Sequence, residues 1–187
     1  MELVLASSSP RRAALLESLG LTFRIVVPDV DETRYPDEEP DTYVERVARM
    51  KVLAVAEPSV VTLAADTTVV HEGRVLGKPA HPGEARSMLA RLQGEVHAVF
   101  TGVAVAADGA VSSAVDRSLV RMTVMTDVEI DRYVAGGEPI DKAGSYALQG
   151  LGGMFVESVE GSPSNVIGLP LHVAARLLRA HGIDPLG

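Results

Sequence analysis

The chain has no cysteine and no tryptophan, and aromatic side chains make up only 4% of its 187 residues. The absence of cysteine excludes disulfides, zinc–thiolate sites and cysteine nucleophiles. No apolar run approaches the roughly 20 residues that a membrane-spanning helix needs. The first ten residues lack both a basic start and a long apolar stretch, so we expect no signal peptide. These absences together predict a soluble cytoplasmic protein with no membrane partner.

Basic residues are also in the minority, with 17 against 25 acidic residues and a net charge of −8. This balance argues against a broad nucleic-acid-binding face, which needs clustered lysine and arginine. It does not exclude a small phosphate ligand, because a few focused cations are enough locally. With 47% hydrophobic residues, the chain can build a sizeable core from Val, Leu, Ala and Met.

Helices and strands are predicted to intermix along the chain, which favours an α/β class. The expected strands cover residues 3–6, 23–27, 60–70, 96–106, 111–124, 145–148 and 154–159, and a further strand returns after the turn at residues 72–73 and reaches residues 76–79. The expected helices cover residues 11–19, 42–56, 84–93, 127–135 and 170–182. The sequence shows no internal repeat and no low-complexity linker, so we expect one domain over residues 1–187, compact or built of two lobes.

The first predicted helix starts in a pattern that suits an anion. Ser9 is a natural N-cap and Pro10 suits the first helical position. Arg11 and Arg12 then oppose the helix dipole unless an anion binds there. Two interpretations stay open: a solvated arginine pair, or a triphosphate cradle made of Ser7, backbone amides and guanidinium groups.

Asp66 interrupts an apolar strand, where a carboxylate without a partner would be costly to bury. One interpretation places it at a solvated strand end. The other uses the turn at Glu72 and Gly73, which sets Lys78 or Pro79 across from Asp66. A carboxylate and an ammonium in this arrangement can orient a metal-bound water and a phosphate.

Lys51 follows Val44 and Val47 at helical spacing and therefore shares their inward face, as Leu53 is also expected to do. Such a lysine either extends its ammonium to water or points into an anionic site. Glu32, in an acidic loop, is either solvated or a hard oxygen ligand for Mg²⁺.

Glycines are dense in residues 141–153, where they allow backbone to approach a ligand closely or simply form a turn. The five histidines show no metal-ligand spacing. The sequence also has no G-x-S-x-G motif, which disfavours a serine hydrolase of that type.

These segments together resemble the Maf family, also described as septum-formation inhibitors. The matching motifs are Leu5-Ala6-Ser7-x-Ser9-Pro10-Arg11-Arg12, Ala65-Asp66-Thr67, Gly77-Lys78-Pro79, Thr101-Gly102-Val103, Asp141-Lys142-Ala143-Gly144, Gln149-Gly150-Leu151-Gly152-Gly153 and Gly161-Ser162-Pro163-Ser164-Asn165-Val166-Ile167-Gly168-Leu169-Pro170. The resemblance implies an α/β fold like that of inosine triphosphate pyrophosphatases, with a mixed twisted sheet, flanking helices and two lobes around a central cleft. It also implies frequent homodimers, a divalent cation (Mg²⁺ or Mn²⁺) and cleavage of a nucleoside triphosphate to monophosphate and pyrophosphate.

The resemblance also implies roles for individual residues. Asp66 would be the catalytic base that activates water, and Glu32 would hold the metal with it. The residues expected to bind phosphates are Ser7, Arg12, Lys51 and Lys78. The residues expected to set substrate preference are Arg11, Thr67 and Gln149.

Residues 143–150 resemble the dTTP/UTP branch of the family, and this resemblance implies house-cleaning of modified pyrimidine nucleotides as a role. The 7-methyl-GTP branch has an acidic residue in place of Gln149, and Ala147-Leu148 departs slightly from the expected small–Ile pair. Two alternatives stay open: a 7-methyl-GTP pyrophosphatase, and a nucleotide-sensing regulator of cell division without turnover.

Overall fold

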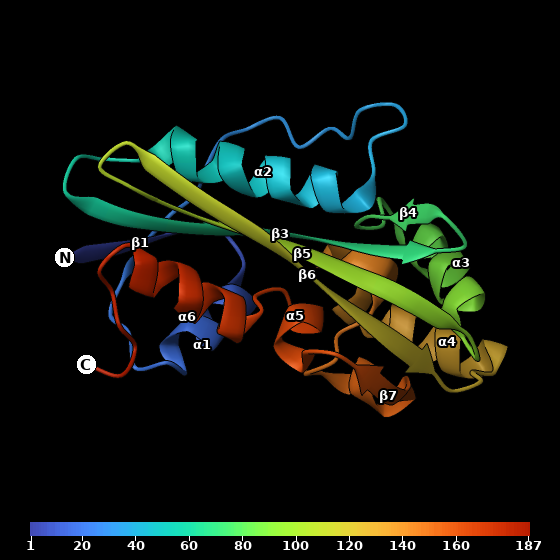
Figure 1. Ribbon diagram of the computed structural model, residues 1–187. Coiled ribbons are helices and arrows are strands. Elements are labelled where there is room, and N and C mark those ends of the chain that lie inside the picture. Colours follow the sequence, from blue (N-terminus) through green and yellow to red (C-terminus); the bar gives the residue numbers. More distant parts are fainter. The chain divides into compact units, whose positions relative to one another are not determined.

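The computed structural model describes residues 1–187, which form a mixed α/β fold with a seven-stranded sheet (Figure 1). The strands are β1 (Glu2–Ala6), β2 (Arg24–Val26), β3 (Val60–His71), β4 (Arg74–Leu76), β5 (Val96–Ala107), β6 (Ala110–Met122) and β7 (Val156–Glu160). The α-helices are α1 (Pro10–Glu17), α2 (Pro40–Val55), α3 (Pro82–Leu92), α4 (Asp127–Ala135), α5 (Pro163–Ile167) and α6 (Leu171–Ala180). Three short 3-10 helices are η1 (Glu138–Asp141), η2 (Ala143–Ser145) and η3 (Leu151–Phe155).

The strand order is β2-β1-β3-β5-β6-β7, with β4 paired to β3. Strand β1 runs parallel to β2 and β3, whereas β4 and β7 are antiparallel to their partners. Two compact units make up the chain. The first unit contains residues 1–66, 101–116 and 168–187, and the second unit contains residues 67–100 and 117–167.

In the first unit, α1 and α6 pack on one face of the strands and α2 packs on the other (Figure 1). Successive residues of a strand point to opposite faces. In β3, Val61, Leu63 and Ala65 therefore pack with α1 and α6, while Ala64 packs with α2. Asp66 follows Ala64 by two residues, so its side chain faces α2.

Helix α2 lies close to β5 because Gly102 has no side chain. A Cβ atom at Gly102 would lie 2.4 Å from the carbonyl oxygen of Val44, well inside contact distance. The buried residues of α2 include Val44, Val47 and Lys51, as the helical spacing predicts. The close approach thus brings the face of α2 that carries Lys51 against the strands.

The second unit has its own core, to which α3 contributes Met88, Leu89 and Leu92 and α4 contributes Ile130 and Tyr133. Leu89 and Leu92 of α3 pack with Ile130 and Tyr133 of α4 and with Met122 of β6. None of the helices in either unit has both the length and the apolarity needed to cross a bilayer.

The predicted strand over residues 145–148 is wrong. Gly144 and Ser145 have φ angles of 69° and 62°, in the left-handed region, and Ser145 is the last residue of η2 instead of the start of an extended segment. Leu53 is 59% exposed, because it lies nine residues after Val44 and is therefore rotated by about half a turn around the helix. Helix α2 begins at Pro40, two residues before the predicted start at residue 42. Helix α5 was not predicted.

Candidate active site

A buried ion pair joins α2 to β3 in the first unit. Lys51 Nζ lies 2.8 Å from Asp66 Oδ1 and 3.0 Å from Glu32 Oε1. The side chains of Lys51 and Asp66 are only 7% and 9% exposed, whereas that of Glu32 is 49% exposed. Burying such a pair carries a desolvation penalty that its own attraction offsets only in part. The cluster is therefore better suited to chemistry than to stabilising the fold.

The environment of Asp66 changes its proton affinity. Burial raises the pKa of the Asp66 carboxyl above its ordinary value, against the opposing charges of Lys51 and Arg12. Burial, followed by the charges of Asp66 and Glu32, also raises the pKa of Tyr43 to about 12. The Tyr43 phenol is thus protonated at neutral pH and donates a hydrogen bond to the carbonyl oxygen of Glu32 at 3.0 Å. A carboxylate whose pKa is raised in this way suits a general base.

The start of α1 holds a second polar group in the same unit. The Ser9 side chain caps the helix by accepting from the backbone N–H of Arg12, as the sequence predicts. The Arg12 guanidinium donates through Nε to the Gly168 carbonyl at 2.8 Å and through Nη1 to Ser7 Oγ at 3.4 Å. Burial lowers the pKa of Arg12, and the charge of Asp66 is the largest opposing influence. Ser7 and Arg12 are therefore in contact, and Arg12 lies within electrostatic reach of Asp66.

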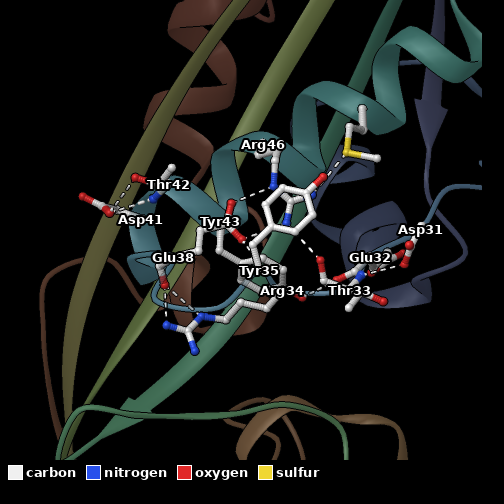
Figure 2. A network of polar contacts seen from close by, with 11 residues as sticks. Asp31, Glu32, Thr33, Arg34, Tyr35, Glu38, Asp41, Thr42, Tyr43 and Arg46 are labelled. Atoms are coloured by element: carbon white, nitrogen blue, oxygen red, sulfur yellow. Dashed lines mark hydrogen bonds and ion pairs between the residues drawn. The ribbon is translucent and has the colours of Figure 1, made fainter.

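The loop that carries Glu32 is held on α2 by Arg46 (Figure 2). Arg46 Nε and Nη2 donate to the two carboxylate oxygens of Glu38 at 2.6 and 2.8 Å, and Nη2 also donates to the Thr33 carbonyl at 3.1 Å. The guanidinium carbon lies 4.1 Å from the centre of the Tyr35 ring, a cation–π contact. A bidentate ion pair of this kind fixes direction as well as distance, so it limits where Glu32 can lie.

The predicted neighbour of Asp66 was Lys78, but the ladder between β3 and β4 ends at Val69 and Leu76. Lys78 follows β4 and is exposed. The pairing predicted from the turn is therefore not part of the observed ladder. The ammonium group that contacts Asp66 is that of Lys51.

The glycine-rich segment approaches side chains of its own unit. A Cβ atom at Gly150 would lie 2.4 Å from Glu138 Oε2, and one at Gly152 would lie 2.3 Å from Tyr133 Oη. These glycines are thus needed for intramolecular contacts, which supports the turn interpretation of the segment. Gln149 lies within this turn and is exposed.

The predicted site residues fall into both units. The first unit brings Ser7 into contact with Arg12, and it brings Glu32 and Asp66 into contact with Lys51. Its remaining candidate is Arg11, in the first turn of α1. The candidates in the second unit are Thr67 in β3, Lys78 after β4 and Gln149 in the turn before η3. Their individual roles stay predictions.

The cluster is also compatible with a divalent cation. Glu32 and Asp66 supply hard carboxylate oxygens, which Mg²⁺ and Mn²⁺ prefer. Both carboxylates contact the same ammonium of Lys51, so an ion bound by one would lie close to the other. No group of three or more His, Cys, Asp or Glu side chains that could hold a metal is found. One or two carboxylates completed by substrate phosphates is a common arrangement for Mg²⁺.

The family model described as Maf-like protein matches residues 2–181. The chain belongs to the Maf-like protein family. It is 48% identical to a dTTP/UTP pyrophosphatase of Shewanella sp. (strain MR-7), with 98% of this chain and 100% of that protein covered. It is 53% identical to a dTTP/UTP pyrophosphatase of Anaeromyxobacter dehalogenans (strain 2CP-C), with 96% of this chain and 94% of that protein covered.

A solved structure, that of the Staphylococcus aureus Ham1 protein, has the same fold. Its TM-score is 0.52 at 15% sequence identity, with 97% of each chain covered. The likeness at this identity concerns the fold alone.

Five residues that shape these sites were not predicted: Tyr43, Glu38 and Arg46 in the first unit, and Tyr133 and Glu138 in the second. Their side chains form hydrogen bonds and ion pairs with residues several positions away in the sequence, and no short motif encodes such contacts. A partial signal exists for Tyr43 and Arg46, which are three residues apart and so lie on one side of α2.

Proposed function

We propose that the protein is a nucleoside triphosphate pyrophosphatase that hydrolyses dTTP and UTP to the nucleoside monophosphate and pyrophosphate. The observation that carries this proposal is similarity, over nearly the whole chain, to Maf-like relatives named dTTP/UTP pyrophosphatase. The buried cluster of Glu32, Lys51 and Asp66 supports it, because a carboxylate beside cations is what the activation of water near phosphate requires.

In the proposed reaction, the oxygen of a water molecule attacks the α-phosphorus while the bond from that phosphorus to the bridging oxygen breaks. Asp66 accepts the proton of the water, and pyrophosphate leaves with the electron pair of the broken bond. Lys51 holds the Asp66 carboxylate in place through its 2.8 Å contact. A divalent cation held by Glu32 and Asp66 would neutralise charge on the phosphates.

The remaining residues are proposed to bind the substrate. Ser7 and Arg12 offer a hydroxyl group and a guanidinium fork to phosphate oxygens. Lys51 and Lys78 are proposed to add positive charge at the phosphates. The residues proposed to act on the base are Arg11, Thr67 and Gln149.

The chemistry of the base explains why Gln149 is the central candidate for specificity. Uracil and thymine present an N3–H donor between two carbonyl acceptors, and a primary amide offers an acceptor and a donor side by side. A site built to pair such groups rejects a mismatched base, because the polar atoms of the site would be left unpaired. We therefore expect UTP and dTTP to be cleaved well above CTP, ATP and GTP.

The test is a panel of UTP, dTTP, CTP, ATP, GTP and 7-methyl-GTP, with kcat/KM and product identity measured for each. Monophosphate and pyrophosphate from UTP and dTTP are the expected products. Release of orthophosphate alone would reject the pyrophosphatase assignment, and a preference for 7-methyl-GTP would place the chain in the other branch. Binding of nucleotide by calorimetry without any turnover would indicate a nucleotide sensor.

A further inference from the structure

We propose that Glu138 is a positioning residue for Gln149, and that it sets discrimination between uracil and cytosine by fixing the backbone on both sides of Gln149. This inference rests on the proposed function, in which Gln149 recognises the base. All the residues that carry it belong to the second unit.

One carboxylate holds the end of the turn that follows Gln149. Glu138 Oε2 accepts from the backbone N–H of Leu151 at 3.0 Å, and Oε1 accepts from the backbone N–H of Gly152 at 2.9 Å. The Oε1 atom also accepts from the phenol of Tyr133 at 2.7 Å. The carboxylate thus has three donors, which fix both of its oxygens.

The Tyr133 phenol extends this arrangement to the residues before Gln149. Its oxygen accepts from the backbone N–H of Ala147 at 3.2 Å while its own proton goes to Glu138. Glu138 and Tyr133 therefore hold the chain at Ala147 on one side of Gln149 and at Leu151 on the other. We call this arrangement the Glu138 clamp.

The glycines of the turn are explained by the clamp. Gly150 has φ −115°, a value open to any residue, so only steric space requires a glycine there. A Cβ atom at that position would lie 2.4 Å from Glu138 Oε2, and Glu138 cannot swing away without giving up its hydrogen bonds. At Gly152 the obstructing atom is Tyr133 Oη at 2.3 Å. Backbone and clamp can lie this close only when both positions are glycine.

The protonation states suit these roles. Burial acts to raise the pKa of the Glu138 carboxyl, but the hydrogen bonds from Tyr133, Gly152 and Leu151 and the charge of Lys142 hold the pKa below its ordinary value. Burial and the bond to Glu138 raise the pKa of the Tyr133 phenol. At neutral pH the carboxylate can therefore only accept, and the phenol retains its proton to donate.

The clamp matters for specificity because a glutamine amide can rotate. A freely moving amide can satisfy cytosine as well as uracil by exchanging its acceptor and donor. Discrimination therefore requires neighbouring groups that hold the amide in one orientation, and a fixed backbone keeps the amide within their reach. Gln149 is exposed, whereas the backbone on either side of it is held by the clamp. Loss of the clamp should lower discrimination without removing any group from the cleavage step.

The decisive variant is Glu138→Gln, which keeps the shape of the side chain but replaces one acceptor oxygen with a donor. We expect the ratio of kcat/KM for UTP to that for CTP to fall about tenfold, the scale of one hydrogen bond to a charged group. The change should appear mainly in KM for UTP, with kcat for CTP little altered.

The matched control is Glu129→Gln in the same unit. Glu129 Oε2 also accepts from a backbone N–H and a hydroxyl group, both of Thr126 at 2.7 Å, but these contacts cap α4. This variant should lower the melting temperature and leave the ratio of UTP to CTP unchanged. A role of Glu138 in stability alone would make the two variants behave alike.

Tyr133→Phe gives an independent measurement, because it removes the contact to Ala147 and leaves the two backbone bonds of Glu138 in place. It should lower the ratio of kcat/KM for UTP to that for CTP about threefold, and it tests the clamp even if Glu138→Gln does not fold.

A wild-type preference for UTP that survives in the folded variants overturns only this inference, as does an equal loss on both substrates. A wild-type protein with no preference for UTP over CTP overturns the proposed function and the inference together.

Discussion

The buried cluster of Glu32, Lys51 and Asp66 in the first unit and the Glu138 clamp in the second unit each depend on a carboxylate. Their surroundings shift the pKa values of Asp66 and Glu138 in opposite directions. Burial dominates at Asp66, and the pKa of its carboxyl is raised despite the neighbouring cations Lys51 and Arg12. At Glu138 burial also acts to raise the pKa, but hydrogen bonds from Tyr133 and from the backbone, with the charge of Lys142, lower it. A carboxylate whose proton affinity is raised can take up a proton during a reaction, whereas one whose oxygens are saturated with donors serves to hold geometry.

The two groups also differ in the contacts that hold them in place. In the first unit, ionic side chains hold one another, as Arg46 holds Glu38 and Lys51 holds both Glu32 and Asp66. In the second unit, Glu138 and Tyr133 hold backbone N–H groups. Substitutions in the cluster of Glu32, Lys51 and Asp66 should therefore change the rate for every substrate. Substitutions in the Glu138 clamp should change the ranking of substrates.

The largest effect is expected from Asp66→Asn, which removes the proposed base while preserving shape. Turnover should fall roughly 10²-fold or more for all substrates, the scale of a lost general base. Nucleotide binding should be largely retained. The control is Asp108→Asn at the β5–β6 turn of the same unit, where φ is 47° and asparagine is well tolerated. Near-wild-type turnover in folded Asp66→Asn would show that the buried carboxylate is not the base.

The next effect is expected from Gln149→Glu, which leaves only acceptors facing the base. The kcat/KM for UTP and dTTP should fall by about 10- to 100-fold, because the uracil carbonyl loses its donor. The same change at Gln93 is the control, since a glutamate there keeps an acceptor for the N–H of Met125. If Gln149→Glu slows every nucleotide by the same factor, Gln149 does not set the ranking of substrates.

The sequence predicts most of the elements, and α4 begins and ends at the predicted residues. Hydrophobic spacing also places Lys51 on the buried face of α2, because periodicity is a local property. The contacts of Asp66 are not local. Its partner was expected to be Lys78 from the turn, and the helix that supplies Lys51 packs against β3 through tertiary contacts that no spacing encodes.

The glycine-rich segment, residues 141–153, shows a second limit of prediction from the sequence. Its composition indicates close approach of the backbone but not what approaches. The predicted strand over residues 145–148 fails because Gly144 and Ser145 adopt left-handed conformations. A Cβ atom at Gly144 would also lie 2.8 Å from the Val69 side chain, a contact with a distant part of the sequence. Glu138 was missed for the same reason, since its partners become neighbours only in the folded unit.

A smaller effect is expected from Arg12→Gln in the first unit. The triphosphate should bind about tenfold more weakly, the scale of a lost charge-assisted contact, while the bare nucleoside should bind almost as before. Calorimetry with UTP and uridine measures both affinities. Arg24→Gln is the control, because Arg24 makes only exposed ion pairs with Glu2 and Glu57. An equal loss for UTP and uridine would argue against a phosphate role for Arg12.

The smallest effect is expected from Tyr43→Phe, which frees the Glu32 carbonyl but leaves the Glu32 carboxylate in place. One neutral hydrogen bond contributes about 1 kcal/mol, so the loop should loosen without detaching from Arg46. We expect the Mg²⁺ concentration for half-maximal rate to rise about threefold, and the stabilisation of the protein by Mg²⁺ in thermal melts to weaken. Tyr35→Phe is the control, since Tyr35 meets Arg46 through its ring, which phenylalanine retains. If both variants shift the Mg²⁺ requirement equally, the Tyr43 hydrogen bond does not position Glu32. The ion pairs of Arg46 with Glu38 and of Lys51 with Glu32 would then be what holds Glu32 in place.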